Sequence, residues 1–283
     1  MTPMEGKRSD AIREAAEAIA AAGALLVAAG AGMGVDSGLP DFRGSAGFWN
    51  AYPPYKNLGL DFYDLASPEW FARDPELAWG FYGHRLELYR RTVPHAGFAR
   101  LLAWAAGKPG GCFVFTSNVD GQFQKAGFAG ERIHECHGSI HRLQCARGCG
   151  PEVWSADGLA VEVDESSMRA RLPLPACPRC GGLARPNVLM FGDWGWQPQR
   201  SREQGRLFQQ WLAALANSRL VIVECGAGTA VPSVRGMSER LLERPGTRLV
   251  RINAREADVP AGQIGLAGGA SPVLEMIARE LPA

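Results

Sequence analysis

The sequence has little that would direct the chain to a membrane or to nucleic acid. No apolar run approaches the roughly 20 residues of a membrane-spanning helix, and the first ten residues lack the apolar core of a secretory signal. The 30 Lys and Arg residues nearly balance the 29 Asp and Glu residues, and the formal net charge of +1 favours neither nucleic acid nor a membrane surface. We also find no internal repeat and no low-complexity tract. We therefore expect a cytoplasmic protein with no nucleic-acid or membrane partner.

The 283 residues that are present suffice for one large domain, or for a large and a small one. Four apolar runs each end in a glycine-rich or polar turn, and their lack of alternation is typical of strands buried on both faces of a parallel sheet. These runs are Ala24–Ala29, Cys112–Thr116, Leu220–Cys225 and 249–252. Helices are predicted at 9–22, with Ser9 as the cap, and at 68–73, Pro75–Arg91, Ala96–Ala106 and 272–281. This order predicts an α/β fold with a doubly wound parallel sheet.

A glycine cluster at residues 30–34 follows the first predicted strand. Glycines let the backbone approach a pyrophosphate and turn its N–H groups toward it, so the cluster predicts a phosphate-binding turn. The fingerprint G-x-G-x-x-G would place its third glycine at Val35, one residue later than here. Pro40 disfavours helical geometry before it and leaves residues 41–43 as a loop beside the phosphates. The alternative is an ordinary strand, turn and helix with charges that face solvent.

Residues 45–94 form an insertion rich in aromatic side chains and proline, between the first and second predicted strands. The segment is too aromatic for a disordered linker. Insertions of this length in compact domains are typically lids or binding elements. A helical cap that packs only for stability is the alternative.

Four of the seven cysteines form two close pairs, Cys145 with Cys149 and Cys177 with Cys180. Glycines beside both pairs supply the tight turns of zinc knuckles, and four thiolates suit a closed, structural zinc site. Because the basic residues of this ribbon are scattered, we do not expect it to bind nucleic acid. The other cysteines fit buried, unreactive thiols: Cys112, Cys136 and Cys225.

Three histidines, His134, His137 and His141, stand just before the zinc ribbon. They could ligate a metal, but the spacing of His134 and His137 is one residue short of H-E-x-x-H. Gly138 and Ser139 form a turn that would leave the His137 ring at the crevice beyond the strand ends, where imidazole can act as a general base near neutral pH.

In their order along the chain, these motifs resemble those of the sirtuins, the Sir2 family of NAD-dependent protein deacylases. The resemblance covers nearly the whole chain. It implies a Rossmann-like NAD-binding domain of residues 1–44, 95–140 and 185–283. The helical insertion of 45–94 and the zinc ribbon of 141–184 would form the small domain, with acyl-lysine proteins or peptides entering between the two.

The resemblance also assigns residues. His137 would be the general base for a ribose hydroxyl, with Asn118 at the nicotinamide as its catalytic partner. The cofactor-binding residues would be Gly30, Ala31, Gly32, Asp41, Phe42, Arg43, Ser117, Asn118, Asp120, Gly226, Gly228 and Asn253. Val188, Phe191 and Gly192 would hold the backbone of the acyl-lysine substrate, and the four paired cysteines would hold one structural zinc ion. NAD is the implied co-substrate, and the products would be free lysine, nicotinamide and O-acyl-ADP-ribose.

The chain departs from the family at several positions. Sirtuins usually have serine at Gly34, glutamine at Ser117 and glutamate at Asp193, and the phosphate turn that begins at Gly226 is one residue shorter here. Glu224 is a charged residue in a strand predicted to be buried, and the sequence does not account for it.

Tyr82 and Arg85 are similar to the Tyr-x-x-Arg element of the desuccinylase branch of sirtuins. An arginine fork binds a carboxylate bidentately and a tyrosine hydroxyl adds a hydrogen bond, so the pair favours acidic acyl groups such as succinyl. A packing tyrosine and a surface arginine are the alternative. For the protein as a whole, two further functions stay open: an NAD-consuming ADP-ribosyltransferase or hydrolase, and a non-enzymatic sensor of NAD or ADP-ribose.

Overall fold

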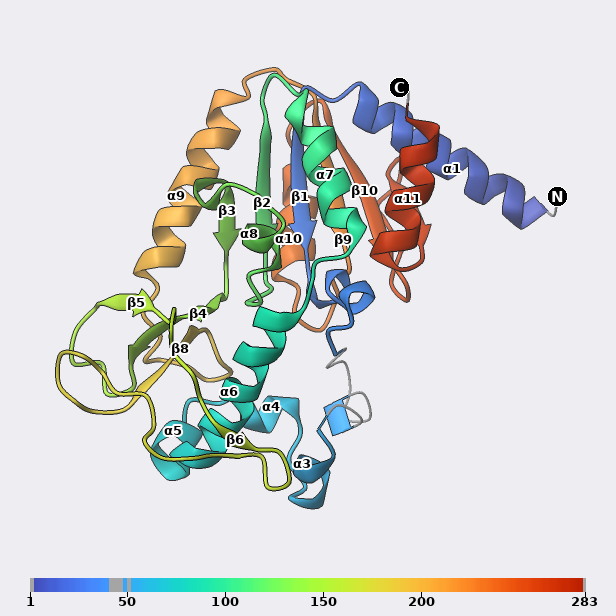
Figure 1. The fold of residues 1–283 in the computed structure, drawn as a ribbon. Coiled ribbons are helices and arrows are strands. Elements are labelled where there is room, and N and C mark those ends of the chain that lie inside the picture. Colours follow the sequence, from blue (N-terminus) through green and yellow to red (C-terminus); the bar gives the residue numbers. More distant parts are fainter. Residues whose placement is uncertain (1–2, 41–47, 50–51, 282–283) are drawn as a thin grey trace.

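The computed structural model describes residues 3–40, 48–49 and 52–281. Its centre is a six-stranded parallel sheet with the strand order β11-β10-β9-β1-β2-β3 (Figure 1). Counted along the chain from the β3 edge, this order is 3-2-1-4-5-6, that of the Rossmann fold. The strands are β1 (Ala24–Ala29), β2 (Cys112–Thr116), β3 (Ile133–Glu135), β9 (Leu220–Cys225), β10 (Thr247–Asn253) and β11 (Ile264–Ala267). The predicted doubly wound α/β class is confirmed.

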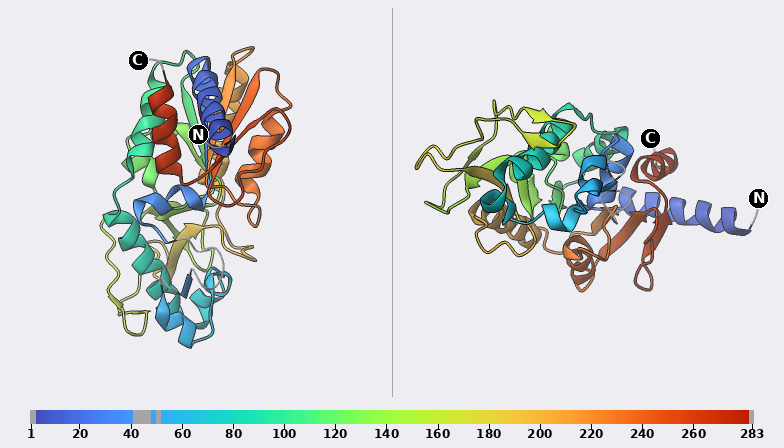
Figure 2. Two further views of the ribbon diagram at one scale, coloured as in Figure 1. Left: turned by 90° about the vertical axis from the view of Figure 1, so that its right-hand side faces the viewer. Right: turned by 90° about the horizontal axis from the view of Figure 1, so that it is seen from below.

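Helices cover both faces of this sheet, as Figure 2 shows. They do so because its strands carry apolar side chains on both sides. Alternate residues of β1 belong to two different hydrophobic cores, and all six are buried. One core contains side chains of α1 (Pro3–Ala20), α7 (Ala96–Ala106) and α11 (Ala270–Glu280). The other contains side chains of α9 (Gln199–Ala214) and α10 (Ser233–Leu241).

The aromatic insertion and the cysteine-bearing segment pack together beyond the carboxyl ends of the sheet strands (Figure 1). A third hydrophobic core joins Phe81 of the insertion to Leu143 and Met168 of the second segment. The Trp79 indole donates a hydrogen bond to the Ala184 carbonyl at 2.9 Å, which ties the two segments together. The insertion holds α3 (Pro53–Asn57), α4 (Phe62–Leu65), α5 (Trp70–Arg73) and α6 (Pro75–Arg91). The other segment holds a sheet of order β5-β4-β8, made of β4 (Gly138–Cys145), β5 (Val153–Ser155) and β8 (Ala184–Val188), and a hairpin of β6 (Val163–Asp164) and β7 (Arg169–Ala170).

Short helical turns complete the chain. They are η1 (Ala31–Met33), η2 (Val35–Ser37), α8 (Gln122–Lys125) and η3 (Gly130–Arg132). Within the described residues, none of the helices combines the length and apolar character that a membrane crossing requires. The proposed domain boundaries stay a prediction.

The predicted cap at Ser9 is wrong, because α1 already begins at Pro3 and Ser9 lies inside it. A proline fits the first helical position, where its missing N–H would have no intrahelical partner. β3, β11 and α9 were not predicted from the sequence. The two predicted helices Pro75–Arg91 and Ala96–Ala106 are confirmed with the same bounds.

Candidate active site

A cavity of about 630 Å³ opens at the carboxyl ends of the central strands. β1 lies between β2 and β9 in the sheet, so the chain leaves β1 and β9 in opposite directions and the loops after them diverge. This switch point is where open parallel sheets bind ligands. The lining residues include Gly30 and Ala31 after β1, Ser117, Asn118 and Asp120 after β2, His137 after β3, Ala227 and Gly228 after β9, and Arg255 and Glu256 after β10.

The turns after β1 and β9 pack directly on each other. The Gly32 N–H donates to the Gly226 carbonyl at 3.0 Å. Gly226 has a φ of +64°, and a Cβ there would lie 2.3 Å from the Gly32 carbonyl carbon. A Cβ on Gly30 would lie 2.7 Å from the Ala227 Cα. The glycines are therefore needed for turn packing, and Gly30 and Gly228 bring the backbone of both turns to the wall of the cavity without a side chain.

The first turn continues as η1 and η2 and not as an α-helix, which confirms the predicted interruption. A Cβ on Gly34 would lie 2.8 Å from Cδ1 of the buried Leu39. The serine of the family would therefore require Leu39 to move. The predicted loop residues Asp41, Phe42 and Arg43 lie outside the described residues.

His137 lines the cavity, and its ring contacts two other segments of the chain. Its Nε2 lies 3.0 Å from the Ser233 hydroxyl oxygen at the start of α10, and the ring also bonds to the backbone of Ser117. Burial lowers the pKa of His137, and the bond to Ser117 opposes that effect only in part. The imidazole is therefore neutral at pH 7, as a general base requires.

The glycine after His137 is required by close packing. Gly138 has a φ of +79°, and a Cβ there would lie 2.0 Å from the Asn187 carbonyl oxygen. The His137 carbonyl in turn accepts the Leu189 N–H at 2.9 Å. These two contacts join the histidine turn to the segment that follows β8.

Asn118 and Asp120 also line the cavity, and each is fixed by a local contact. The Asn118 amide donates to the Gly30 carbonyl at 3.0 Å, which ties the β2 loop to the glycine turn. An Asp120 carboxylate oxygen accepts the Gln122 N–H at 2.9 Å. Burial raises the pKa of Asp120 to about 6, so this carboxylate is ionised at pH 7 at a cost in folding free energy.

The other two histidines of the cluster contact different partners among the described residues. His134 Nε2 lies 3.3 Å from the Ser201 hydroxyl oxygen, and His141 Nε2 lies 2.9 Å from the Asp120 carbonyl oxygen. His134, His137 and His141 therefore do not converge as metal ligands.

The turn after β9 is bound by an acidic side chain. The Thr229 N–H and hydroxyl donate to the Glu256 carboxylate at 2.8 and 3.3 Å. Asn253 is buried beneath this region: its amide donates to the Ala227 carbonyl at 2.7 Å and its carbonyl accepts the Arg255 and Glu256 N–H groups. Asn253 shapes the two turns and does not itself line the cavity. Its predicted role in binding NAD stays a prediction.

The far end of the cavity is built by α6. Tyr82 and Arg85 are both buried and both line it, which contradicts the alternative of a surface arginine. The Arg85 Cζ lies 5.6 Å from the centre of the Tyr82 ring. The Tyr82 hydroxyl is buried and has no hydrogen-bond partner among the described residues. A buried hydroxyl without a partner is costly, and a polar ligand beside the guanidinium would satisfy it.

The mouth of the cavity carries apolar side chains. Val188 and Phe191 line it, and the Phe191 ring lies 4.7 Å from that of Tyr63. Gly192 follows in a turn with a φ of +67°. Asp193, where the family has glutamate, forms a buried bidentate ion pair with Arg185 at 2.7 and 2.8 Å. The shorter acid therefore keeps a charge partner.

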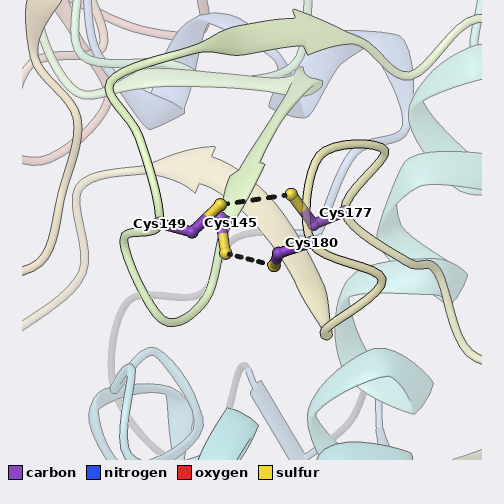
Figure 3. Close-up of side chains that lie close together, drawn as sticks. All are labelled: Cys145, Cys149, Cys177 and Cys180. Carbon is purple, nitrogen blue, oxygen red and sulfur yellow. Dashed lines mark hydrogen bonds between the residues drawn. The ribbon is translucent and has the colours of Figure 1, made fainter.

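The four paired cysteines come together as predicted (Figure 3), and their sulfur atoms all lie within 4.8 Å of one another. Cys145 and Cys180 have sulfurs 3.8 Å apart, and Cys149 and Cys177 have sulfurs 3.6 Å apart. A tetrahedral zinc ion with Zn–S bonds of about 2.3 Å places its sulfurs about 3.8 Å apart. The cluster therefore fits one structural zinc ion, with no position left for a substrate.

Several cavity residues were not predicted from the sequence. They include Tyr89, Arg255 and Glu256, which line the cavity, and Ser233, which contacts His137. Tyr89 could have been predicted, because it stands one helical turn after Arg85 in a predicted helix and side chains at that spacing lie on the same face. The contact of Ser233 joins residues 96 positions apart and has no local signal.

Known proteins match this arrangement. A model described as the Sir2 family matches residues 30–206. NAD-dependent protein deacylase 2 of Pyrobaculum aerophilum is 33% identical over 271 residues, which cover 94% of each chain. The mitochondrial NAD-dependent protein deacylase sirtuin-5 of Danio rerio is 34% identical over 185 residues, 60% of this chain and 57% of that protein. The crystal structure of a Sir2 homologue in complex with NAD has a TM-score of 0.68 at 25% identity, covering 94% of this chain and 93% of the other.

Proposed function

This chain belongs to the Sir2 family, and from that premise we propose that it removes acidic acyl groups, such as succinyl, from protein lysine side chains. Its broader activity is that of its relatives: it is an NAD-dependent protein deacylase. The acidic preference is the finer proposal. It is carried by one observation, that Tyr82 and Arg85 line the same cavity as His137.

The residues present fit NAD. Gly30 and Gly228 line the cavity at two turns whose packing keeps Cβ atoms away, and Asn118 joins the strand-end loops around it. When bound, NAD supplies the ribose carbon that takes up the acyl oxygen as nicotinamide departs. Asn118 and Asp120 would contact the nicotinamide of NAD. The rest of NAD would lie against Gly30, Ala31, Ser117 and Gly228.

His137 is the proposed general base. Its neutral imidazole has one nitrogen engaged by the Ser117 backbone, and Nε2 faces the Ser233 hydroxyl. A ribose hydroxyl in the same place would give its proton to Nε2. The apolar mouth formed by Val188, Leu189 and Phe191 would exclude water and let the acyl-lysine stem enter.

At the inner end, Arg85 would bind the carboxylate of the acyl group and Tyr82 would donate its hydroxyl hydrogen to it. A guanidinium forms short, charge-assisted hydrogen bonds with a carboxylate, and a buried site strengthens them. An acetyl group has no carboxylate and would leave the buried Tyr82 hydroxyl without a hydrogen-bond partner among the described residues. The 34% identity to a sirtuin-5 supports this preference.

The test compares turnover of acetyl- and succinyl-lysine peptides with NAD. We expect a higher kcat/KM for the succinyl peptide, and we expect Arg85→Met to reduce the succinyl-to-acetyl ratio at least about 100-fold, since it removes a charge-assisted pair. Arg91→Met is the matched control on the same helix, because Arg91 is exposed, and it should leave the ratio unchanged. Faster deacetylation that is insensitive to Arg85→Met would overturn the preference.

The same assay separates deacylation from NAD hydrolysis and from ligand sensing. Mass spectrometry of the products should show nicotinamide and O-acyl-ADP-ribose in equal amounts, and only when an acylated peptide is present. Nicotinamide release without peptide would indicate a hydrolase. Bound NAD without turnover of any peptide would indicate a sensor.

A further inference from the structure

Tyr89 holds Arg85 by a contact along one side of α6. The Tyr89 hydroxyl oxygen accepts hydrogen bonds from Arg85 Nε at 3.1 Å and from Arg85 Nη2 at 2.7 Å. The two residues are one helical turn apart, so their side chains lie next to each other. Tyr89 is 5% exposed and lines the same cavity as Tyr82 and Arg85. The guanidinium is therefore fixed at one place along the cavity.

Tyr89 is itself held by a contact with a second helix. Its backbone carbonyl accepts a hydrogen bond from the Gln122 side chain at 3.2 Å, which ties this turn of α6 to α8. Its ring centre lies 5.3 Å from the Arg85 Cζ. A flexible arginine is thus attached to a rigid aromatic ring in a packed region.

The anchor carries no charge. Burial raises the pKa of Tyr89, so its phenol stays neutral across the working pH range. A carboxylate in its place would add a negative charge beside the guanidinium, whereas a phenol oxygen orients the guanidinium without adding one. The hydroxyl hydrogen of Tyr89 is directed away from Arg85, since Arg85 can only donate.

We propose that Tyr89 is a positioning residue that sets the length of the acyl chain this enzyme accepts; the inference rests on the proposed preference for acidic acyl groups. An arginine with a free, flexible side chain can bind a carboxylate at several positions along the cavity. An anchored guanidinium can bind it at only one position. Malonyl, succinyl and glutaryl groups differ by one methylene each and carry their carboxylates to different depths. The native enzyme therefore discriminates among these three, and loss of the Tyr89 hydroxyl weakens the discrimination.

The experiment measures kcat and KM of malonyl-, succinyl- and glutaryl-lysine peptides with NAD for the native protein and for Tyr89→Phe, which keeps the ring. For the native protein we expect the best chain to exceed the others about 10-fold in kcat/KM, as one methylene typically gives. In Tyr89→Phe we expect the three values to come within about threefold of one another, through a rise in KM for the best chain and little change in kcat.

Tyr55→Phe is the matched control. It removes another hydroxyl of the same aromatic core, which donates to the Met168 carbonyl at 3.3 Å, and Tyr55 does not line the cavity. Tyr55→Phe should keep the native order and spread of kcat/KM among the malonyl, succinyl and glutaryl peptides. A change that is confined to Tyr89→Phe would then come from loss of the contact with Arg85 and not from a general loosening of the core. An unchanged profile in a folded Tyr89→Phe protein would overturn the inference.

Failure of the underlying function gives a different result. If Arg85→Met leaves the succinyl-to-acetyl ratio unchanged, the acidic preference itself is wrong, and the inference about Tyr89 falls with it. If Arg85→Met abolishes that ratio while Tyr89→Phe keeps the native profile, only the role of Tyr89 is wrong.

Discussion

His137 Nε2 lies 3.0 Å from the hydroxyl oxygen of Ser233, a contact that joins the segment after β3 to the start of α10. The ring also bonds to the backbone of Ser117, a bond that raises the pKa of His137 and therefore has the ring as its donor. A neutral imidazole then has Nε2 as an acceptor, and Ser233 supplies the hydrogen. Ser233 thereby occupies the position at which the proposed base would take a proton.

We expect His137→Ala to lower deacylation at least about 100-fold, because a positioned general base typically contributes that much or more. Ser233→Ala should change kcat/KM less than about threefold, since a substrate hydroxyl replaces Ser233 at the same nitrogen. O-acyl-ADP-ribose formation, followed by mass spectrometry, measures both. Full activity in His137→Ala would contradict the assignment, and a loss in Ser233→Ala equal to that in His137→Ala would make Ser233 part of the chemistry.

The pH profile should reflect the depressed pKa of His137. The active form of a general base is the neutral one, and burial lowers the pKa of His137 from its ordinary value of 6.5. Activity should therefore persist as the pH falls through 6.5 and be lost only below it. The measurement is kcat/KM of an acylated peptide against pH at saturating NAD. An acidic midpoint above 6.5 would show that the ring is not desolvated as the structure indicates.

The four central strands could be predicted from the sequence because each is a long apolar run buried on both faces. The edge strands β3 and β11 could not be predicted, because segments of three or four residues of mixed polarity are too short to show a hydrophobic periodicity. Glu224 has its explanation in the sheet register: it stands directly opposite Arg251 on β10. Two lone charges in neighbouring apolar strands hinted at this pair, but the strand order that makes them neighbours is a property of the fold.

The same limit applies to the site. The glycine turns, His137 and the cysteine pairs carry local spacing signals, and Tyr82 with Arg85 carries the spacing of one helical turn. Glu256 does not, because its carboxylate accepts the Thr229 N–H from the loop after a different strand. Contacts between loops that follow different strands depend on sheet order and loop shape, which residue spacing does not encode.

Arg251→Met should destabilise the protein strongly. Arg251 forms ion pairs with Glu224 at 2.5 Å and with Glu239 at 2.9 Å, and the Glu224 side chain is fully buried. Loss of the arginine leaves a buried carboxylate without its charge partner, which typically costs about 3–5 kcal/mol. Urea denaturation measures the change in the free energy of unfolding.

Two further variants make that experiment decisive. Arg248→Met, on the same strand, removes an exposed ion pair with Glu14 and should cost no more than about 1 kcal/mol. Combining Glu224→Leu with Arg251→Met should recover much of the lost stability, because no charge is then left buried. A double variant as unstable as Arg251→Met would mean that the arginine acts through packing and not through its charge.

Zinc removal should inactivate the enzyme as well as destabilise it. β4 runs from Gly138, next to His137, to Cys145 of the metal cluster, and β8 runs from the same ribbon to Val188 at the cavity mouth. We expect about one zinc ion per chain by elemental analysis, and loss of zinc, of melting temperature and of activity in Cys177→Ser. Cys112→Ala, outside the cluster, should keep the metal. Native activity in zinc-free protein would show that the active site does not depend on the metal-bound ribbon.

Asp120→Asn should stabilise the protein at neutral pH and weaken its function. Burial raises the pKa of Asp120 to about 6, above the value of about 3.9 in an unfolded chain. A group with a raised folded pKa contributes stability that is present at low pH and lost as the pH rises through the folded value, here on the order of 2–3 kcal/mol by pH 7.5. Asparagine keeps an oxygen for the Gln122 N–H and carries no charge to desolvate.

The melting temperature of Asp120→Asn should therefore exceed that of the native protein at pH 7.5. The difference should shrink as the pH falls through about 6 and vanish only below about 3.9, where the carboxyl is protonated in the unfolded chain as well. Asp10→Asn, at an exposed position on α1, should show no such pH-dependent gain. The KM for NAD should rise, because Asp120 is proposed to contact nicotinamide. A variant that is less stable at pH 7.5 would show that the charge is compensated in the folded state. A more stable variant with unchanged NAD kinetics would contradict the proposed role of Asp120 in NAD binding. The buried charge would then lower stability without contributing to the binding of NAD.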